Sequence, residues 1–254
     1  MICKPEVGVE FRNKVLVIGE SCRDVFVYCD AIRLAPDVPV PVLSVIDQVE
    51  NPGMAKNVWR NIQSLHANCD IVTNTNWYNI TKTRYMHKTS NHMFFRVDAP
   101  HDIPPCDIDA VDLASYELVV VSDYNKGYLT EDHIDQICRR HQRVFLDTKK
   151  PLGKWASHAF IIKINDYEYN HTPTEYQQLL HGKLIHTMGA QGCEYMGQRY
   201  KVDPVEVRDT SGAGDSFMAG LVVQFLQSNN MITAVEFANQ CASKVVRQRG
   251  VTVI

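Results

Sequence analysis

The segment 209–215, with the sequence DTSGAGD, has the residue types that phosphoryl transfer needs, and it opens directly into an apolar helical pattern. Gly212 and Gly214 allow a tight turn and the close approach of a ligand. The start of a helix offers unpaired N–H groups and a positive dipole end, which together bind anions. Asp215 follows at the edge of this turn, where a carboxylate can accept a proton from an attacking hydroxyl. We therefore predict a general base beside an anion hole made by the backbone amides of Gly212, Ala213 and Gly214.

Short apolar runs that end at polar turns alternate with helical patterns along the chain. The runs lie at 14–19, 117–121, 143–146, 159–164 and 184–188, and such runs are typical of strands buried on both faces of a parallel sheet. Helical spacing occurs at 57–65, 217–226 and 235–246, and Gly250 is expected to end the last helix. Thr130 is predicted to cap a further helix. The alternation predicts a doubly wound α/β fold, with a mostly parallel sheet and helices on both faces.

Two segments do not follow this alternation. Residues 38–45, VPVPVLSV, favour an edge strand or a lid, because Pro cannot donate a hydrogen bond to a central ladder. Residues 82–97 predict two strands around a turn at Ser90 and Asn91. We expect a small β lid with strands near 25–47 and 80–98, attached to a single domain over residues 1–254.

Composition excludes several classes of function. The chain of 254 residues is 45% apolar and 22% charged, with a formal net charge of −3, which is ordinary for a globular protein and disfavours a nucleic-acid partner. The sequence has no apolar stretch near the roughly 18 residues of a membrane span and no signal-peptide pattern. Its eight cysteines are scattered, which predicts free thiols in a reducing cytoplasm. No zinc motif, P-loop or dinucleotide fingerprint occurs.

The stretch DTSGAGDSF resembles the signature of the ribokinase-like (PfkB) carbohydrate kinases. This resemblance implies an ATP- and Mg²⁺-dependent phosphotransferase that acts on a sugar hydroxyl, with Asp215 as base. Residues 15–24, VLVIGESCRD, are similar to the family's first strand and imply that Asp24 binds sugar hydroxyls. Residues 52–57, PGMAKN, are similar to its sugar-binding motif of two glycines followed by an asparagine, where Gly53 and Asn57 match and Met54 replaces the second Gly.

The nucleotide side of the family site also has counterparts in this sequence. Residues 165–168, NDYE, resemble the NxxE motif, which implies that Asn165 and Glu168 organise Mg²⁺, through water, and phosphate. Residues 187–192, TMGAQG, resemble the strand and turn on which ATP lies. The resemblance therefore assigns these residues to ATP: Thr187, Gly189 and Gly192, together with Asn239 near the adenine.

Among the subfamilies, the chain is most similar to the heptose 7-phosphate kinases, which occur alone or fused to an adenylyltransferase. The similar stretches are residues 33–42, 122–129, 146–149 and 237–253. Asp123 and Lys126 follow the C-terminal end of a predicted strand, where ligands of open α/β sheets bind, so they are candidates for the substrate site. Lys149 is a candidate for binding the nucleotide phosphates. Basic residues in the lid strands, namely Lys82, Arg84 and Arg96, are candidates for binding the phosphate of the substrate.

Alternatives remain open at this point. The substrate could be an unphosphorylated sugar or a nucleoside. The chain could instead be a pseudokinase, since Met54 departs from the motif and the segment between Ala67 and Ile80 is shorter than the family's, where a further α/β unit is usual. We expect no adenylyltransferase domain, because the chain ends soon after Gly250. The lid strands could pair across a homodimer.

Overall fold

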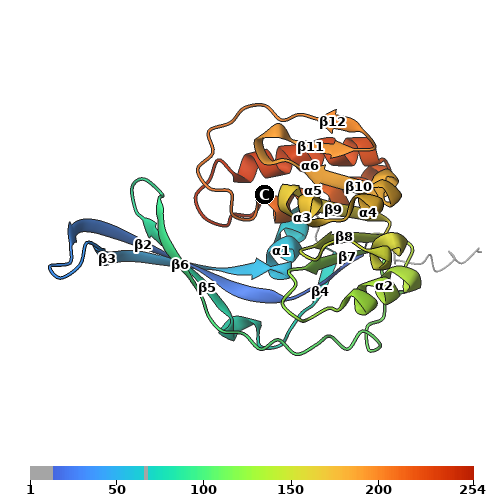
Figure 1. Cartoon of the computed structure of the whole chain (residues 1–254). Coiled ribbons are helices and arrows are strands. Elements are labelled where there is room, and N and C mark those ends of the chain that lie inside the picture. The colour runs from blue at the N-terminus through green and yellow to red at the C-terminus, as the bar shows by residue number, and fades with distance from the viewer. Residues whose placement is uncertain (1–13, 66–67) are drawn as a thin grey trace, which may run out of the picture.

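The computed structural model describes residues 14–65 and 68–254, and its larger part is an eight-stranded sheet with the order β12-β11-β10-β9-β8-β7-β1-β4 (Figure 1). Strands β4, β1, β7, β8, β9 and β10 run parallel, and β11 and β12 join antiparallel at one edge. The bounds are β1 (Val15–Ile18), β4 (Cys69–Val72), β7 (Leu118–Asp123), β8 (Val144–Thr148), β9 (Ile161–Asn165), β10 (Leu184–Thr187), β11 (Cys193–Tyr195) and β12 (Gln198–Tyr200).

Helices cover both faces of this sheet, because its strands are apolar on both sides. Val15 and Val17 pack with helices α1, α5 and α6, whereas Leu16 and Ile18 belong to the opposite core, which contains α2 and residues of α3 and α4. The bounds are α1 (Ala55–Leu65), α2 (Glu131–Arg140), α3 (Asp166–His171), α4 (Thr174–Leu179), α5 (Ala213–Ser228) and α6 (Met231–Val245), with single 3₁₀ turns η1 (Trp77–Asn79), η2 (Lys154–His158), η3 (His181–Lys183) and η4 (Gly189–Gln191). The predicted doubly wound fold is confirmed.

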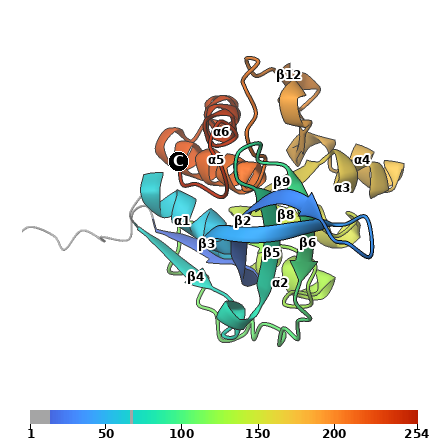
Figure 2. The same cartoon turned by 90° about the vertical axis from the view of Figure 1, so that its left-hand side faces the viewer.

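A second sheet of four strands projects from the main sheet as a lid (Figure 1, Figure 2). Its order is β3-β2-β5-β6, with β2 (Ser21–Leu34), β3 (Pro41–Met54), β5 (Thr81–His87) and β6 (Met93–Asp98). The proline-containing strand β3 lies at the edge, as predicted, and β5 and β6 pair antiparallel around the predicted turn. The lid lies beside the end of the main sheet at which the parallel strands finish.

The helix ends agree with the sequence at one position and differ at another. Thr130 caps α2, and its side chain accepts a hydrogen bond from the His133 amide. The prediction that Gly250 ends the last helix is wrong, because α6 ends at Val245. The carbonyl of Val246 accepts hydrogen bonds from the amides of Arg208 and Asp209, so it is bound to another segment instead of to a further helical turn.

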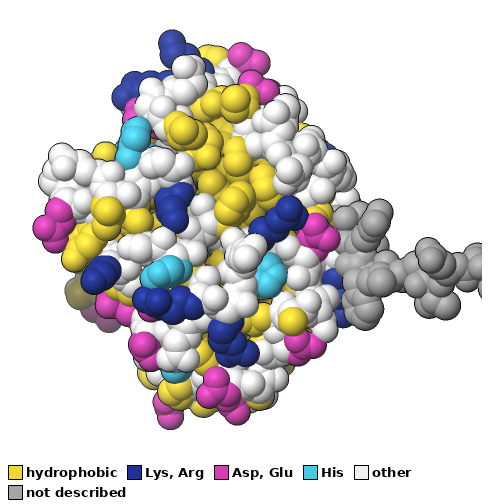
Figure 3. Space-filling model, turned by 90° about the vertical axis from the view of Figure 1, so that its right-hand side faces the viewer, with side chains coloured by type: hydrophobic (Ala, Val, Ile, Leu, Met, Phe, Trp, Pro, Cys, Tyr) yellow, Lys and Arg dark blue, Asp and Glu magenta, His cyan; other side chains and the backbone are white. Residues whose placement is uncertain are grey.

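The surface at the end away from the lid carries interspersed Lys, Arg, Asp and Glu side chains around an apolar area, with no large region of one charge (Figure 3). The seven cysteines in the described part of the chain are free and buried, as predicted. Among residues 14–65 and 68–254, no helix combines the length and apolar character that a membrane crossing requires.

Candidate active site

The turn before α5 has the conformation that the glycine pattern predicted. Gly212 has a φ of 80° and precedes the first helical residue, Ala213. A Cβ at position 212 would also lie 2.9 Å from Nδ2 of Asn57, so a side chain there would displace the Asn57 amide. The first amides of a helix have no carbonyl partner within it, so this turn directs N–H groups and a positive dipole end toward the C-terminal ends of the parallel strands.

Asp215 is the first acidic residue of α5, and it is buried with 8% of its surface exposed. Its Oδ2 accepts a hydrogen bond of 2.7 Å from Nδ2 of Asn57, and its Oδ1 accepts one of 2.5 Å from the hydroxyl of Tyr124. Burial raises the pKa of Asp215, while these two hydrogen bonds lower it. The result is a fixed carboxylate with a raised proton affinity, as a general base requires.

A buried ion pair lies beneath the anion hole. Nζ of Lys163, on β9, is 2.8 Å from Oδ2 of Asp147, on β8, and both side chains are at most 5% exposed. A Cβ at Gly214 would lie 3.0 Å from the same ammonium, so Gly214 allows the turn to approach Lys163 closely. Lys163 therefore adds positive charge at the place where the helix N-terminus would receive an anion.

The NDYE motif forms the start of α3. Asn165 caps the helix by accepting hydrogen bonds from the amides of Tyr167 and Glu168, and Oε2 of Glu168 accepts from the Asn165 amide at 2.7 Å. Oε1 of Glu168 is 2.9 Å from Nζ of Lys149. The neighbouring carboxylates Asp147 and Glu168 raise the pKa of Lys149, although its burial alone would lower it. Both motif residues are thus already engaged, so a cation here would be reached through water.

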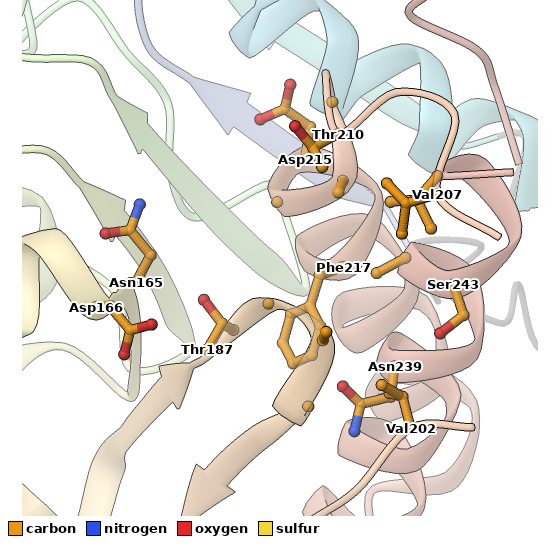
Figure 4. Close-up of a pocket in the computed structure, with 18 of the residues that line it drawn as sticks. Asn165, Asp166, Thr187, Val202, Val207, Thr210, Asp215, Phe217, Asn239 and Ser243 are labelled. Carbon is orange, nitrogen blue, oxygen red and sulfur yellow. The ribbon is translucent and has the colours of Figure 1, made fainter. Parts of the chain in front are cut away.

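A cavity of about 780 Å³ extends from Asp215 between β9, β10 and the helices α5 and α6 (Figure 4). Asn165 and Asp166 lie on one side of it, and Asn239 and Ser243 on the other (Figure 4). The apolar part of its lining consists of Val202, Val205, Val207, Phe217, Ala242 and Val246. Residues that the sequence assigned to the nucleotide also line it, namely Lys149, Thr187, Gly189, Gly192 and Asn239. An apolar slot that leads to an anion hole fits the base and the phosphates of a nucleotide.

The substrate residues predicted in the lid meet on one face of it. Oδ1 of Asp24 is 2.6 Å from Nη1 of Arg84, and a Cβ at Gly53 would lie only 2.1 Å from Oδ2 of Asp24. Arg96 lies opposite Arg84 in the strand register and binds Asp98 with two hydrogen bonds. The Lys82 ammonium lies 3.0 Å from Sδ of Met54. Asn57 on α1 donates directly to Asp215, the predicted base.

Of the two predicted substrate residues near the end of β7, Asp123 is engaged within the protein, while Lys126 is bound through its backbone and its side-chain role stays a prediction. Asp123 is 1% exposed, and both of its carboxylate oxygens bind Nζ of Lys150 at 2.7 and 2.9 Å. The amide of Lys126 donates to Oε1 of Glu20 at 2.8 Å. The structure therefore places Asp123 under the loop after β7, where its oxygens are already occupied.

The sequence analysis did not single out three side chains that the structure brings to this site or beneath it: Tyr124, Lys163 and Glu20. Lys163 is a lysine inside the apolar run AFIIKI, and a buried charge in such a run indicates a special role. Tyr124 lies within the stretch SDYNKGYL that was singled out, next to the aspartate that drew attention. Glu20, directly after β1, carries no comparable signal.

Comparison with known proteins adds to this geometry. The family profile described as pfkB family carbohydrate kinase matches residues 73–254. The bifunctional protein HldE of Helicobacter pylori is 30% identical, covering 94% of this chain and 64% of its own length. The HldE of Rhodopseudomonas palustris is 27% identical over 96% of this chain and 62% of its own. The chain thus spans less than two thirds of the length of these curated relatives.

Solved structures share the fold. Ribokinase from Thermotoga maritima superposes with a TM-score of 0.71 at 14% identity, covering 94% of each chain. Phosphofructokinase-2 from Escherichia coli in complex with fructose-6-phosphate gives 0.69 at 15% identity, covering 93% of this chain and 94% of the other. At these identities the likeness concerns the fold alone.

Proposed function

Because the chain belongs to the pfkB family of carbohydrate kinases, we propose that it transfers the γ-phosphoryl group of ATP to a hydroxyl of a sugar phosphate of the heptose 7-phosphate type. One observation carries this proposal: the buried carboxylate of Asp215 lies at the N-terminus of α5. On one side of it is the 780 Å³ cavity, here called the nucleotide-type cavity, and on the other is the basic face of the lid, which carries Lys82, Arg84 and Arg96. Residues 1–254 would act as one kinase domain with its lid.

The described residues fit a nucleotide and a magnesium ion. The apolar slot accepts a base, and Lys163, Lys149 and the amides of the α5 turn lie where phosphates would follow. The magnesium ion would be held mainly by phosphate oxygens and water near Asn165 and Glu168, because Mg²⁺ gives up its water ligands reluctantly. When bound, Mg-ATP supplies the transferable phosphoryl group and offsets its charge.

The protein groups then have separate tasks. Asp24 and Asn57 orient the sugar, and Asp215 takes the proton of the attacking hydroxyl as its oxygen bonds to phosphorus. The amides of residues 212–214 stabilise the negative charge on the transferring group, together with Lys163. Closure of the lid over the acceptor would exclude water, so that the sugar and not water is phosphorylated.

The charge pattern of the lid supports a phosphorylated acceptor. Asp24 on β2, Lys82 on β5 and Asp98 on β6 lie directly opposite one another in the strand register, and Arg84 and Arg96 form the next pair along β5 and β6. This face of the lid therefore has three cations and two carboxylates. Like charges on directly opposite residues repel, and an anion placed between them would relieve that repulsion. Lys82 has no carboxylate partner among its described contacts, so it is the cation best able to meet a substrate phosphate.

The test is ADP release from Mg-ATP with heptose 7-phosphate, fructose 6-phosphate, ribose, fructose and adenosine. We expect turnover with a phosphorylated sugar, reduced about 100-fold or more by Asp215→Asn. The remote Asp70→Asn serves as the matched control and should keep full activity. Turnover only with ribose, fructose or adenosine would favour the unphosphorylated substrate, and ATP binding without any turnover would indicate a pseudokinase.

We also propose that the lid pairs with a second copy and that the protein works in the cytoplasm. Apolar side chains of the lid are exposed to an unusual degree, including Ile32 (86%), Val45 (63%) and Phe95 (48%). Analytical ultracentrifugation should give a dimer that Phe95→Lys weakens. A reducing, ATP-containing compartment suits the free cysteines and the proposed reaction.

A further inference from the structure

Tyr124 lies where the proposed donor and acceptor subsites meet. It follows β7 directly and lines the nucleotide-type cavity. The ammonium of Lys82, from the lid, is 5.3 Å from the centre of its ring, and that of Lys149, from the nucleotide side, is 5.7 Å away. Cations at these distances are attracted by the aromatic ring. Tyr124 is therefore in contact with a charged residue of each subsite.

The hydroxyl of Tyr124 also reaches the base. It is 2.5 Å from Oδ1 of Asp215, while Asn57 binds Oδ2 at 2.7 Å. Burial and the nearby Asp215 raise the pKa of Tyr124 well above its ordinary value. The phenol therefore stays protonated and donates a hydrogen bond to the carboxylate. Each carboxylate oxygen then has one protein donor, and the remaining lone pairs can accept the proton of an incoming hydroxyl.

The backbone around Tyr124 is fixed by buried carboxylates. Oε1 of Glu20, a fully buried residue, accepts hydrogen bonds from the amides of Tyr124 at 3.0 Å and Lys126 at 2.8 Å. Oδ1 of Asp123 accepts from the amide of Asn125 at 3.2 Å. Asn125 has a φ of 55°, which turns the chain sharply after the tyrosine. The loop is thus tied down on both sides, so the phenol has a defined position.

We propose that Tyr124 is a positioning residue of the kinase reaction, acting through Asp215: its phenol holds the carboxylate oriented and anionic between the two subsites. The proposal rests on the proposed function for its kinetic consequence. Other groups act on the same carboxylate. Asp147 on β8 raises the pKa of Asp215, Lys163 on β9 and Asn57 on α1 lower it, and burial raises it most. Removing the phenol removes one lowering contribution, so the pKa of Asp215 should rise in Tyr124→Phe.

The kinetic test compares Tyr124→Phe with Tyr116→Phe. Tyr116 makes the same kind of bond, 2.8 Å from its hydroxyl to Asp70, far from the site. For Tyr124→Phe we expect kcat/KM to fall about tenfold at pH 7 and the acid limb of its pH profile to move to higher pH, with partial recovery in alkaline buffer. Tyr116→Phe should leave the profile unchanged. A fall in rate with an unshifted acid limb would mean that Tyr124 serves only packing.

A second test does not depend on turnover. The side-chain carboxyl carbons of ¹³C-labelled aspartates are titrated by NMR, and the Asp215 signal is assigned by its absence in Asp215→Asn. The pKa of Asp215 should be higher in Tyr124→Phe than in the wild type and unchanged in Tyr116→Phe, where the pKa of Asp70 should rise instead. An unchanged Asp215 titration overturns the proposal. Absence of wild-type turnover contradicts the proposed function, while this titration still decides the role of Tyr124.

Discussion

Replacing Met54 with Gly should destabilise the protein, although glycine is the residue that the resembled sugar-binding motif has at this position. Met54 has a φ of 60°, and a left-handed conformation costs a residue with a Cβ about 1–2 kcal/mol, which Gly would recover. The Met54 side chain is only 4% exposed and belongs to the main core, and deletion of such a side chain costs about 2–5 kcal/mol. The cavity therefore outweighs the relieved strain, and we expect a net loss of about 1–3 kcal/mol.

The chain contains a matched control for this substitution. Met196, in the turn between β11 and β12, has a φ of 51° but is 61% exposed. Met196→Gly recovers the same strain without leaving a cavity, so it should be neutral or stabilising by up to about 1 kcal/mol.

The assay is thermal unfolding of both variants beside the wild type, with urea titration as a check on the free energy of unfolding. At about 2–4 °C per kcal/mol for a chain of this size, Met54→Gly should lower Tm by about 2–12 °C. Met196→Gly should keep or raise it. Equal effects of the two substitutions would refute the reasoning, because burial is the main difference between the two sites.

Gly53→Ala should raise the KM for sugar about tenfold, because its Cβ would lie 2.1 Å from the Asp24 carboxylate; Gly182→Ala, with no atom within 4 Å of its Cβ, should match the wild type in the same assay. Lys163→Met removes the 2.8 Å partner of the buried Asp147 carboxylate and leaves it only the Lys149 ammonium at 3.9 Å, so stability should fall by about 3 kcal/mol in urea titration; unchanged stability would contradict the buried ion pair. The acid limb of kcat/KM should lie above the ordinary aspartate range, because burial raises the pKa of Asp215 and the base must be ionised to act; a limb at the pKa of free aspartate would count against this assignment.

Much of the fold could be predicted because its signals are local. Strands β1, β7, β8 and β9 are short continuous apolar runs bounded by polar turns, which is typical of strands buried on both faces of a sheet. The lid was identifiable from Pro41 and the turn after β5, which do not fit a central strand. The end of α6 could not be predicted in this way. The carbonyl of Val246 accepts hydrogen bonds from a segment almost 40 residues earlier in the chain, and such a contact leaves no pattern in the local sequence.

The site was predictable where backbone conformation dictates residue type, as at Gly212, and where a motif repeats a known pattern. It was not predictable where neighbours compete for the same oxygen. Asp123 was a candidate for the substrate because it follows a strand end, yet Lys150 binds both of its oxygens, whereas Asp24 lies on the lid face beside Arg84. Which carboxylate is left to face the substrate is decided by tertiary packing, which sequence spacing does not report.

The position of β4 at the edge of the main sheet explains how this chain can be shorter than its relative over the aligned region and still keep the candidate site together. The alignment with the Helicobacter HldE runs over 302 positions against the 254 residues of this chain, so that relative carries insertions, and β4 is the last strand of the main sheet on its side. Directly after β4, Asn74 accepts a hydrogen bond from the Ser21 amide, and Thr73 binds the Ser21 hydroxyl, both at 2.7 Å. The same hydroxyl accepts from the amide of Lys56 at 3.1 Å, at the start of α1. The end of β4 thus ties the strand that carries Asp24 to the helix that carries Asn57, and any element beyond it would lie outside this connection.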